Sequence, residues 1–143
     1  MIIIFTLVLS SCTNVGIPLD PSLTARMDNT GAQLDRAKAL SIINHLRATK
    51  GVAALNINSE LNNQANILAA KYAASNKAPK KPDNISAMQL SAGYADFANT
   101  FSGWRSNVSS VDILTNPKYS NAGITVVYSQ NSTHGVYWVL LLD

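Results

Sequence analysis

Side chains that ionise or attack other groups near neutral pH are scarce in this chain. It has two histidines, His45 and His134, and a single cysteine, Cys12. A hydrolase built on Ser109 or Ser110 would need a base beside the hydroxyl. The two histidines fall elsewhere, His45 within a helical pattern and His134 in a turn-rich segment. The sequence therefore predicts no catalytic residue, and we interpret both serines as turn residues.

Cys12 follows an apolar run, residues 1–11, that is too short to cross a bilayer as a helix. The run ends in Leu9-Ser10-Ser11-Cys12, which resembles the lipobox of bacterial lipoproteins. This pattern predicts a signal peptide over 1–11, lipidation of Cys12 and a tether over 12–33. Because Thr13 follows the cysteine, the resemblance implies an exported, outer-membrane lipoprotein facing the periplasm. The alternative is a free thiol in a buried N-terminal strand, which the lack of a basic residue before the run favours.

Length and charge exclude some classes of function. At 143 residues the chain suits one domain with its own hydrophobic core. The net charge is only +3, and the basic residues are dispersed except for Lys77, Lys80 and Lys81. A surface that follows nucleic acid needs a basic stripe, so we expect no nucleic-acid partner. The three lysines lie in a proline-containing segment that we interpret as a solvated loop, with the rim of an anionic-ligand site as the alternative.

Three segments have the apolar periodicity and the capping residues of helices. They run from about Asp35 to Lys50, from Ser59 to Ser75 and from Asp96 to about Asn107, and a single further turn is expected at Val111–Leu114. Gly51 stands where a left-handed residue would end the first helix, and Asn58 or Ser59 caps the second. On the first helix, His45 is interpreted as partly buried and hydrogen-bonded.

The last two apolar segments, Ala122–Tyr128 and Val136–Leu142, do not alternate with polar residues. Strands have this composition when both faces are covered, and the turn-rich link 129–135 predicts an antiparallel hairpin. We interpret Asn84–Ala95 as a loop with a little extended structure. The sequence predicts an α+β fold over 34–143, a three-layer α-β-α sandwich with a small antiparallel sheet.

Several short motifs occur in a definite order along the same stretch. They are Ile43-Asn44-x-x-Arg47-Ala48, Ser91-Ala-Gly-Tyr94, Phe101-x-Gly-Trp104-Arg105, Asn116-Pro117-x-Tyr119-x-x-x-Gly123-Ile124 and Tyr137-Trp138-Val139. In order and spacing they resemble the CAP superfamily, the SCP-like domain of cysteine-rich secretory and pathogenesis-related proteins. The resemblance covers about residues 35–143. It implies an open groove lined by histidines and carboxylates, often able to hold a divalent metal.

This chain departs from the family at the groove positions that the resemblance implies. Asn76 and Ser110 stand where histidines are usual, and Met88-Gln89 replaces a Glu-Asn pair. Amide, thioether and hydroxyl side chains do not replace imidazole and carboxylate as zinc ligands, and they do not exchange protons near neutral pH. We therefore expect no metal, no cofactor and no catalysis at these positions.

Together these features predict a bacterial cell-envelope protein, held on the membrane through lipidated Cys12, whose CAP/SCP-like domain is not an enzyme. Its partner would be a lipid, a glycan such as peptidoglycan, or a protein, bound in a groove lined by Asn76, Met88, Gln89 and Ser110. Two alternatives remain: a degenerate serine-type hydrolase, and a structural envelope protein with no ligand in the groove.

Overall fold

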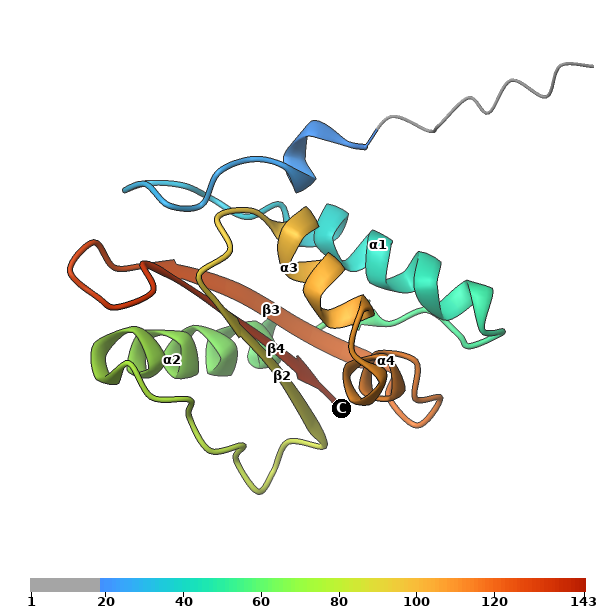
Figure 1. The fold of residues 1–143 in the computed structure, drawn as a ribbon. Helices are drawn as coiled ribbons and strands as arrows, with labels where there is room; N and C mark the ends of the chain where they lie inside the picture. Colours follow the sequence, from blue (N-terminus) through green and yellow to red (C-terminus); the bar gives the residue numbers. More distant parts are fainter. Residues whose placement is uncertain (1–18) are drawn as a thin grey trace, which may run out of the picture.

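The computed structural model describes residues 19–143, and Figure 1 shows them as a layered domain. In chain order the elements are η1 (Pro21–Leu23), α1 (Arg36–Thr49), β1 (Asn56–Ile57), α2 (Ser59–Ser75), β2 (Ala87–Ala92), α3 (Phe97–Arg105), α4 (Val108–Leu114), β3 (Asn121–Tyr128) and β4 (Val136–Leu142). The predicted signal peptide and Cys12 lie outside the described residues. Within 19–143, no helix is both long and apolar enough to cross a membrane.

The sheet has the order β1-β3-β4-β2 and forms the middle layer. The β3–β4 hairpin is antiparallel, as predicted, and β2 adds an antiparallel strand on the other side of β4. The short β1 pairs in parallel with β3, so the sheet is mixed and not purely antiparallel. All seven residues of β4 are buried, because helices cover both faces. The predicted α+β sandwich is confirmed.

Each face of the sheet has its own hydrophobic core. Trp138 and Leu140 of β4 point into the core beneath α1 and α3, whereas Val139 and Leu141 pack against α2. This alternation follows from the two-residue period of a strand. Gly123 of β3 lies so close to α2 that an added Cβ would be 2.2 Å from the carbonyl carbon of Leu61. Only glycine allows this approach.

Polar side chains fix the helix starts. Asp35 Oδ1 accepts a hydrogen bond from the Lys38 amide at 3.0 Å, and Asn58 Oδ1 caps α2 in the same way. Asn107 Oδ1 accepts from the Ser110 amide, so a helix begins at Val108, earlier than the predicted single turn. Gly51 has a φ of 70°, which confirms its role after the end of α1.

Two predictions about element and domain boundaries fail in the described residues. Ala87–Ala92, predicted to be mostly loop, is a six-residue strand. Part of the predicted tether over 12–33 is packed on the domain, because Leu23 and Met27 are 6% and 3% exposed within the α1/α3 core. The Met27 amide also donates to the carbonyl of Ala95 at 2.6 Å. The packed domain therefore begins well before residue 34.

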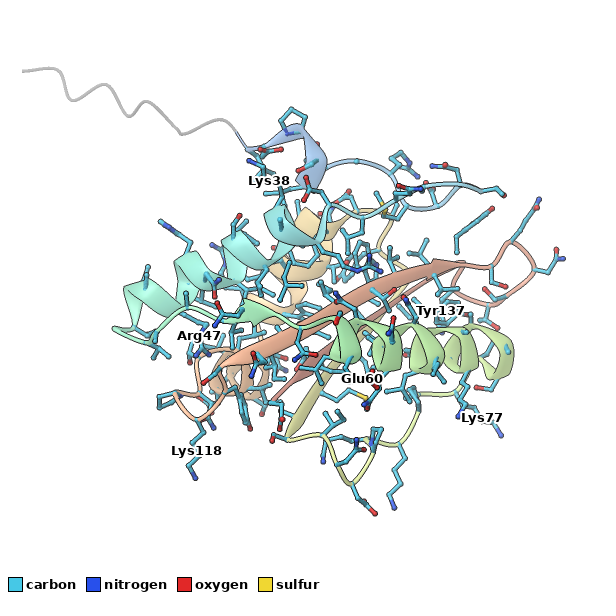
Figure 2. The ribbon with its side chains drawn as sticks, turned by 180° about the vertical axis from the view of Figure 1, so that it is seen from behind. Lys38, Arg47, Glu60, Lys77, Lys118 and Tyr137 are labelled. Atoms are coloured by element: carbon cyan, nitrogen blue, oxygen red, sulfur yellow. The ribbon has the colours of Figure 1, made fainter. Side chains whose placement is uncertain are left out.

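Arg47 joins α1 to the segment that follows α4, and Figure 2 labels it near the end of α1. The residue is fully buried, and burial lowers the pKa of its guanidinium. Its nitrogens donate to four backbone carbonyls: those of Ala53, Leu114, Asn116 and Tyr119, at 2.7, 2.8, 3.1 and 2.9 Å. The family motif residue Arg47 is thus a structural hydrogen-bond donor.

Candidate functional site

The structure brings two of the four predicted groove residues into contact. Gln89 of β2 donates from Nε2 to Ser110 Oγ of α4 at 2.9 Å. The Ser110 hydroxyl in turn donates to Asn107 Oδ1 at 3.4 Å, and Ser110 is only 6% exposed. Within 19–143, the side-chain partners of this hydroxyl are therefore two carboxamides. A carboxamide does not take up a proton near neutral pH, so this serine has no base to activate it.

The other two predicted residues lie on the opposite face of the sheet. Met88 packs against the α2 core, because adjacent residues of β2 point to opposite faces. Asn76 ends α2 in the left-handed conformation, with a φ of 54°. Its Oδ1 accepts from the Tyr137 hydroxyl at 2.5 Å and from the Thr133 amide at 3.0 Å. The expectation of one groove lined by all four residues is therefore not met.

Two tyrosines lie next to each other near Asn76. Tyr72 of α2 meets Tyr137 of β4 edge to face, with ring centroids 4.9 Å apart. Burial raises the pKa of Tyr72, and the neighbouring Tyr137 raises it further. The Tyr72 phenol is therefore neutral at physiological pH, and the pair contributes ring packing and the hydrogen bond from Tyr137 to Asn76.

Both histidines are exposed. His134 lies in the β3–β4 turn, as predicted. His45 is also exposed, which contradicts the prediction that it is partly buried. Ser109 is exposed on α4 and Ser110 lies in the same helix, so the interpretation of both serines as turn residues is wrong. Among residues 19–143, no three His, Cys, Asp or Glu side chains gather at one point where a metal ion could bind.

The lysines after α2 differ in their surroundings. Lys77 points away from the domain at the end of α2, as Figure 2 shows, and Lys80 is exposed as well. Lys81 instead donates to the carbonyls of Pro82, at 3.2 Å, and Ile85. The loop interpretation is confirmed, and Lys81 is one of the residues that shape the loop.

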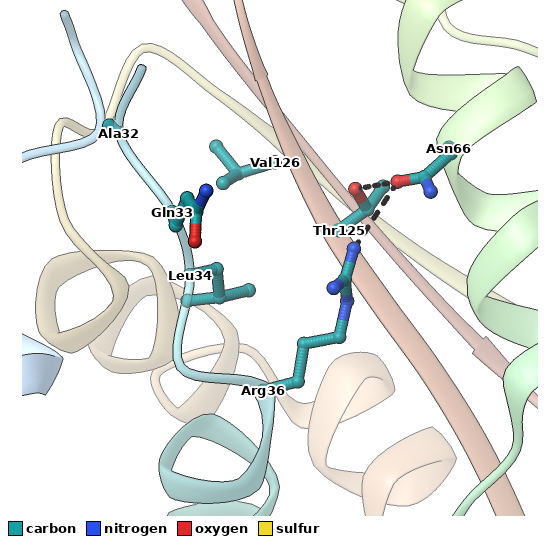
Figure 3. A pocket seen from close by; sticks show the side chains of 7 residues that line it. All are labelled: Ala32, Gln33, Leu34, Arg36, Asn66, Thr125 and Val126. Atoms are coloured by element: carbon teal, nitrogen blue, oxygen red, sulfur yellow. Dashed lines mark hydrogen bonds between the residues drawn. The ribbon is translucent and has the colours of Figure 1, made fainter.

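Two cavities lie away from the predicted positions. One, of about 430 Å³, lies between α1 and α3 and is lined by Ile42, His45, Leu46, Thr49, Phe101 and Arg105. The other, of about 400 Å³, lies between the segment before α1, β3 and α2, and Figure 3 shows its lining. Sequence reasoning missed both, because their residues come from elements far apart in the chain, and the spacing within one element does not show which other element it faces.

The second of these cavities has a polar centre. Arg36 donates from Nε to the carbonyl of Ile124 at 2.8 Å, and its Nη2 lies 3.5 Å from Asn66 Oδ1. The Thr125 hydroxyl donates to the same Asn66 oxygen. These contacts hold an arginine of α1, an asparagine of α2 and a threonine of β3 in one place, as the dashed lines in Figure 3 show.

Comparisons with known proteins agree with the fold. A model of the cysteine-rich secretory protein family (CAP) matches residues 40–142. No curated protein matches the sequence. An outer surface protein of Borrelia burgdorferi has a similar structure, with a TM-score of 0.61 at 17% identity over 76% of this chain and 90% of that one.

Two further solved structures are similar over the same part of the chain. A cysteine-rich secretory protein of Staphylococcus aureus gives a TM-score of 0.58 at 20% identity, over 75% of this chain and 37% of that one. An extracellular protein of Bacillus anthracis that contains a SCP domain gives a TM-score of 0.62 at 12% identity, over 75% of this chain and 39% of that one. This chain thus spans less than half the length of the Staphylococcus aureus and Bacillus anthracis proteins. At identities this low, the similarity shows a shared fold and nothing more.

Proposed function

The chain belongs to the cysteine-rich secretory protein (CAP) family, and we propose that it is a non-catalytic binding module of the cell envelope. The contact between Gln89 and Ser110 carries this proposal. The family resemblance implies a histidine at the position of Ser110, whereas here a buried hydroxyl is hydrogen-bonded to carboxamides. Such a cluster stabilises the packing of α4 on β2, and it offers neither a general base nor a metal ligand.

Binding, in contrast to catalysis, needs a concave surface that complements the ligand in shape and polarity, but no group that transfers protons. Each of the two cavities, at about 400 and 430 Å³, is in the size range of small-molecule sites, roughly 300–1,000 Å³. The partner would come from the envelope: a lipid, a glycan such as peptidoglycan, or a protein.

The exposed lysine loop after α2 is tested separately from the cavities. Purified peptidoglycan fragments are the first probe, with Lys80→Ala as the test variant and Lys118→Ala as a matched exposed control. Binding that weakens only in K80A would argue against a purely structural protein.

Catalysis can be tested directly with a fluorophosphonate probe that labels activated serines covalently. We expect the wild-type protein to remain unlabelled, because among the described side chains the Ser110 hydroxyl is hydrogen-bonded only to carboxamides, and Ser109 is exposed. Labelling that disappears in Ser110→Ala or in Ser109→Ala would overturn the proposal and restore the serine-hydrolase alternative.

The envelope location rests on the lipobox that ends at Cys12. Two similar proteins are an outer surface protein and an extracellular protein, which supports export. An acylated Cys12 would hold the domain on the outer membrane, where more than one acyl chain gives stable anchoring. Mass spectrometry of the mature N-terminus should find an acylated cysteine as the first residue. An unmodified N-terminus, or a Cys12→Ser variant that is still in the membrane fraction, would contradict the anchor.

A further inference from the structure

The cavity between α1, α2 and β3 has the features of a built polar site. Its volume is about 400 Å³, and its walls are Ala32, Gln33, Leu34, Arg36, Asn66, Thr125 and Val126. Figure 3 shows Gln33 and Leu34 on the segment that leads into α1, across from Thr125 and Asn66. Thr125 is 2% exposed and belongs to the packed sheet, whereas Gln33 and Asn66 are exposed, so the cavity has a buried polar floor and an open polar side.

The hydrogen bonds inside the cavity leave donors in excess. The Asn66 side-chain oxygen already accepts from Thr125 and from Arg36 Nη2, and Arg36 Nε is bonded to the carbonyl of Ile124. Within residues 19–143, no group accepts from Arg36 Nη1 or from the side-chain amide nitrogen of Asn66. Asn66 is exposed and Arg36 is half-buried, so these N–H donors face the open side of the cavity, and the complementary ligand presents acceptor oxygens to them.

The positive charge of Arg36 also favours a ligand with oxygen acceptors, in particular an anion. The ion pairs within residues 19–143 are Arg26–Asp28 and Lys38–Asp20, so the described part of the chain provides no carboxylate partner for Arg36. Among the described residues, no Asp or Glu lines the cavity. A guanidinium is permanently cationic and is more weakly hydrated than an ammonium, so it pairs readily with an incoming anion.

We propose that this cavity binds a small ligand through a carboxylate group, with Arg36 as the charged anchor and the Asn66 and Gln33 amides as further donors. A single cation matches the one charge of a carboxylate better than the greater charge of a phosphate. The apolar side chains of Leu34 and Val126 form the wall for the rest of a sugar-sized or amino-acid-sized molecule. The inference rests on the proposed binding function and specifies one of its ligands.

Calorimetric titration of the protein with D-glucuronate, N-acetylalanine, D-glucose and inorganic phosphate tests this inference. We expect saturable binding of at least one carboxylate, with a dissociation constant below about 10 mM, and weaker binding of glucose and phosphate. Preference for glucuronate would identify an acidic sugar as the source of the carboxylate, and preference for N-acetylalanine a peptide terminus. Failure of both carboxylates to bind, or tighter binding of glucose or phosphate, would overturn the proposal.

The variant Asn66→Asp keeps the acceptor oxygen for Thr125 but replaces the donor nitrogen with a negatively charged oxygen. It should weaken carboxylate binding about tenfold or more, because it repels the ligand and pairs with Arg36. Asn63→Asp makes the same change at another exposed position of α2, one that does not line the cavity, and it should bind as the wild type does. Equal binding by N66D and N63D would refute the site.

Should N66D fail to fold, Arg36→Lys provides the second variant. It keeps the charge but loses the Nε and Nη2 donors that fix Arg36 against Ile124 and Asn66, so the cation is no longer held in the cavity and carboxylate binding should weaken by about tenfold. The wild-type affinity in R36K would contradict the role of Arg36. Fluorophosphonate labelling of Ser110 would defeat the proposed function but leave these titrations unchanged, so the two failures can be told apart.

Discussion

Replacement of Arg47 by methionine should destabilise the domain strongly. Methionine fills a similar elongated space but has no donor, so four backbone carbonyls lose the nitrogens that now lie 2.7–3.1 Å away. At ~1 kcal/mol for each lost hydrogen bond, the free energy of unfolding should fall by about 4 kcal/mol. Domains of this kind are stable by only about 5–15 kcal/mol, so this is a large fraction of the total.

Urea unfolding followed by circular dichroism measures the effect. With a slope of ~1.5 kcal/mol per molar urea, a loss of about 4 kcal/mol lowers the midpoint by ~2.7 M. Arg105→Met is the matched control, because Arg105 is exposed on α3 and its replacement should change stability by less than ~0.5 kcal/mol. If R47M stays within ~1 kcal/mol of the wild type, the four carbonyls find other partners and the structural role of Arg47 is refuted.

Three further changes test other parts of the structure. Gly123→Ala should cost at least ~3 kcal/mol, because the new methyl would meet the backbone of Leu61 at 2.2 Å, and a thermal melt unchanged from the wild type would contradict this close packing. Trp104→Phe removes an indole N–H that donates to a β2 carbonyl at 2.9 Å, so urea unfolding should show a loss of ~1–3 kcal/mol. Hydrogen bonds from Ser22 lower the pKa of Asp20 from 3.8 to about 2. Their stabilising contribution is complete above pH 3.8 and disappears as the pH falls through about 2, so the urea midpoints of the wild type and Asp20→Asn should converge between pH 5 and pH 2.

Local signals in the sequence were enough to predict most of the secondary structure. The caps Asp35 and Asn58 fix the starts of α1 and α2, because a side-chain oxygen before a helix satisfies an otherwise free amide. The uninterrupted apolar run of β4 predicts burial on both faces, and the structure confirms it. These predictions succeed because each depends on a few neighbouring residues.

The parts that failed depend on partners distant in the sequence. β2 is an edge strand whose residues Met88, Gln89, Leu90, Ser91 and Ala92 are only half-buried, and its composition gives little sign of a strand. Because the strand was not predicted, the placement of Met88 and Gln89 on opposite faces of the sheet was not predicted either. A single groove was therefore expected for residues that the sheet separates.

The Arg36 cavity shows the same limit for a binding site. Arg36, Asn66 and Thr125 are on α1, α2 and β3, and no spacing rule connects residues 30 and 59 positions apart. Only the close packing of α2 on β3, which Gly123 permits, brings the asparagine and the threonine together. A sequence pattern can identify a motif within one element, but it does not show which elements share a cavity.

The central claim is that this CAP domain keeps the family scaffold while an amide and hydroxyl cluster occupies the place of its proton-transferring and metal-binding groups. Calorimetric titration of the untagged protein with zinc tests this claim most directly. We expect no one-to-one binding tighter than about 10 μM, because Gln89, Ser110 and Asn107 supply no ligand that zinc prefers. Stoichiometric binding well below that concentration, lost on mutation of residues around Ser110, would contradict the account.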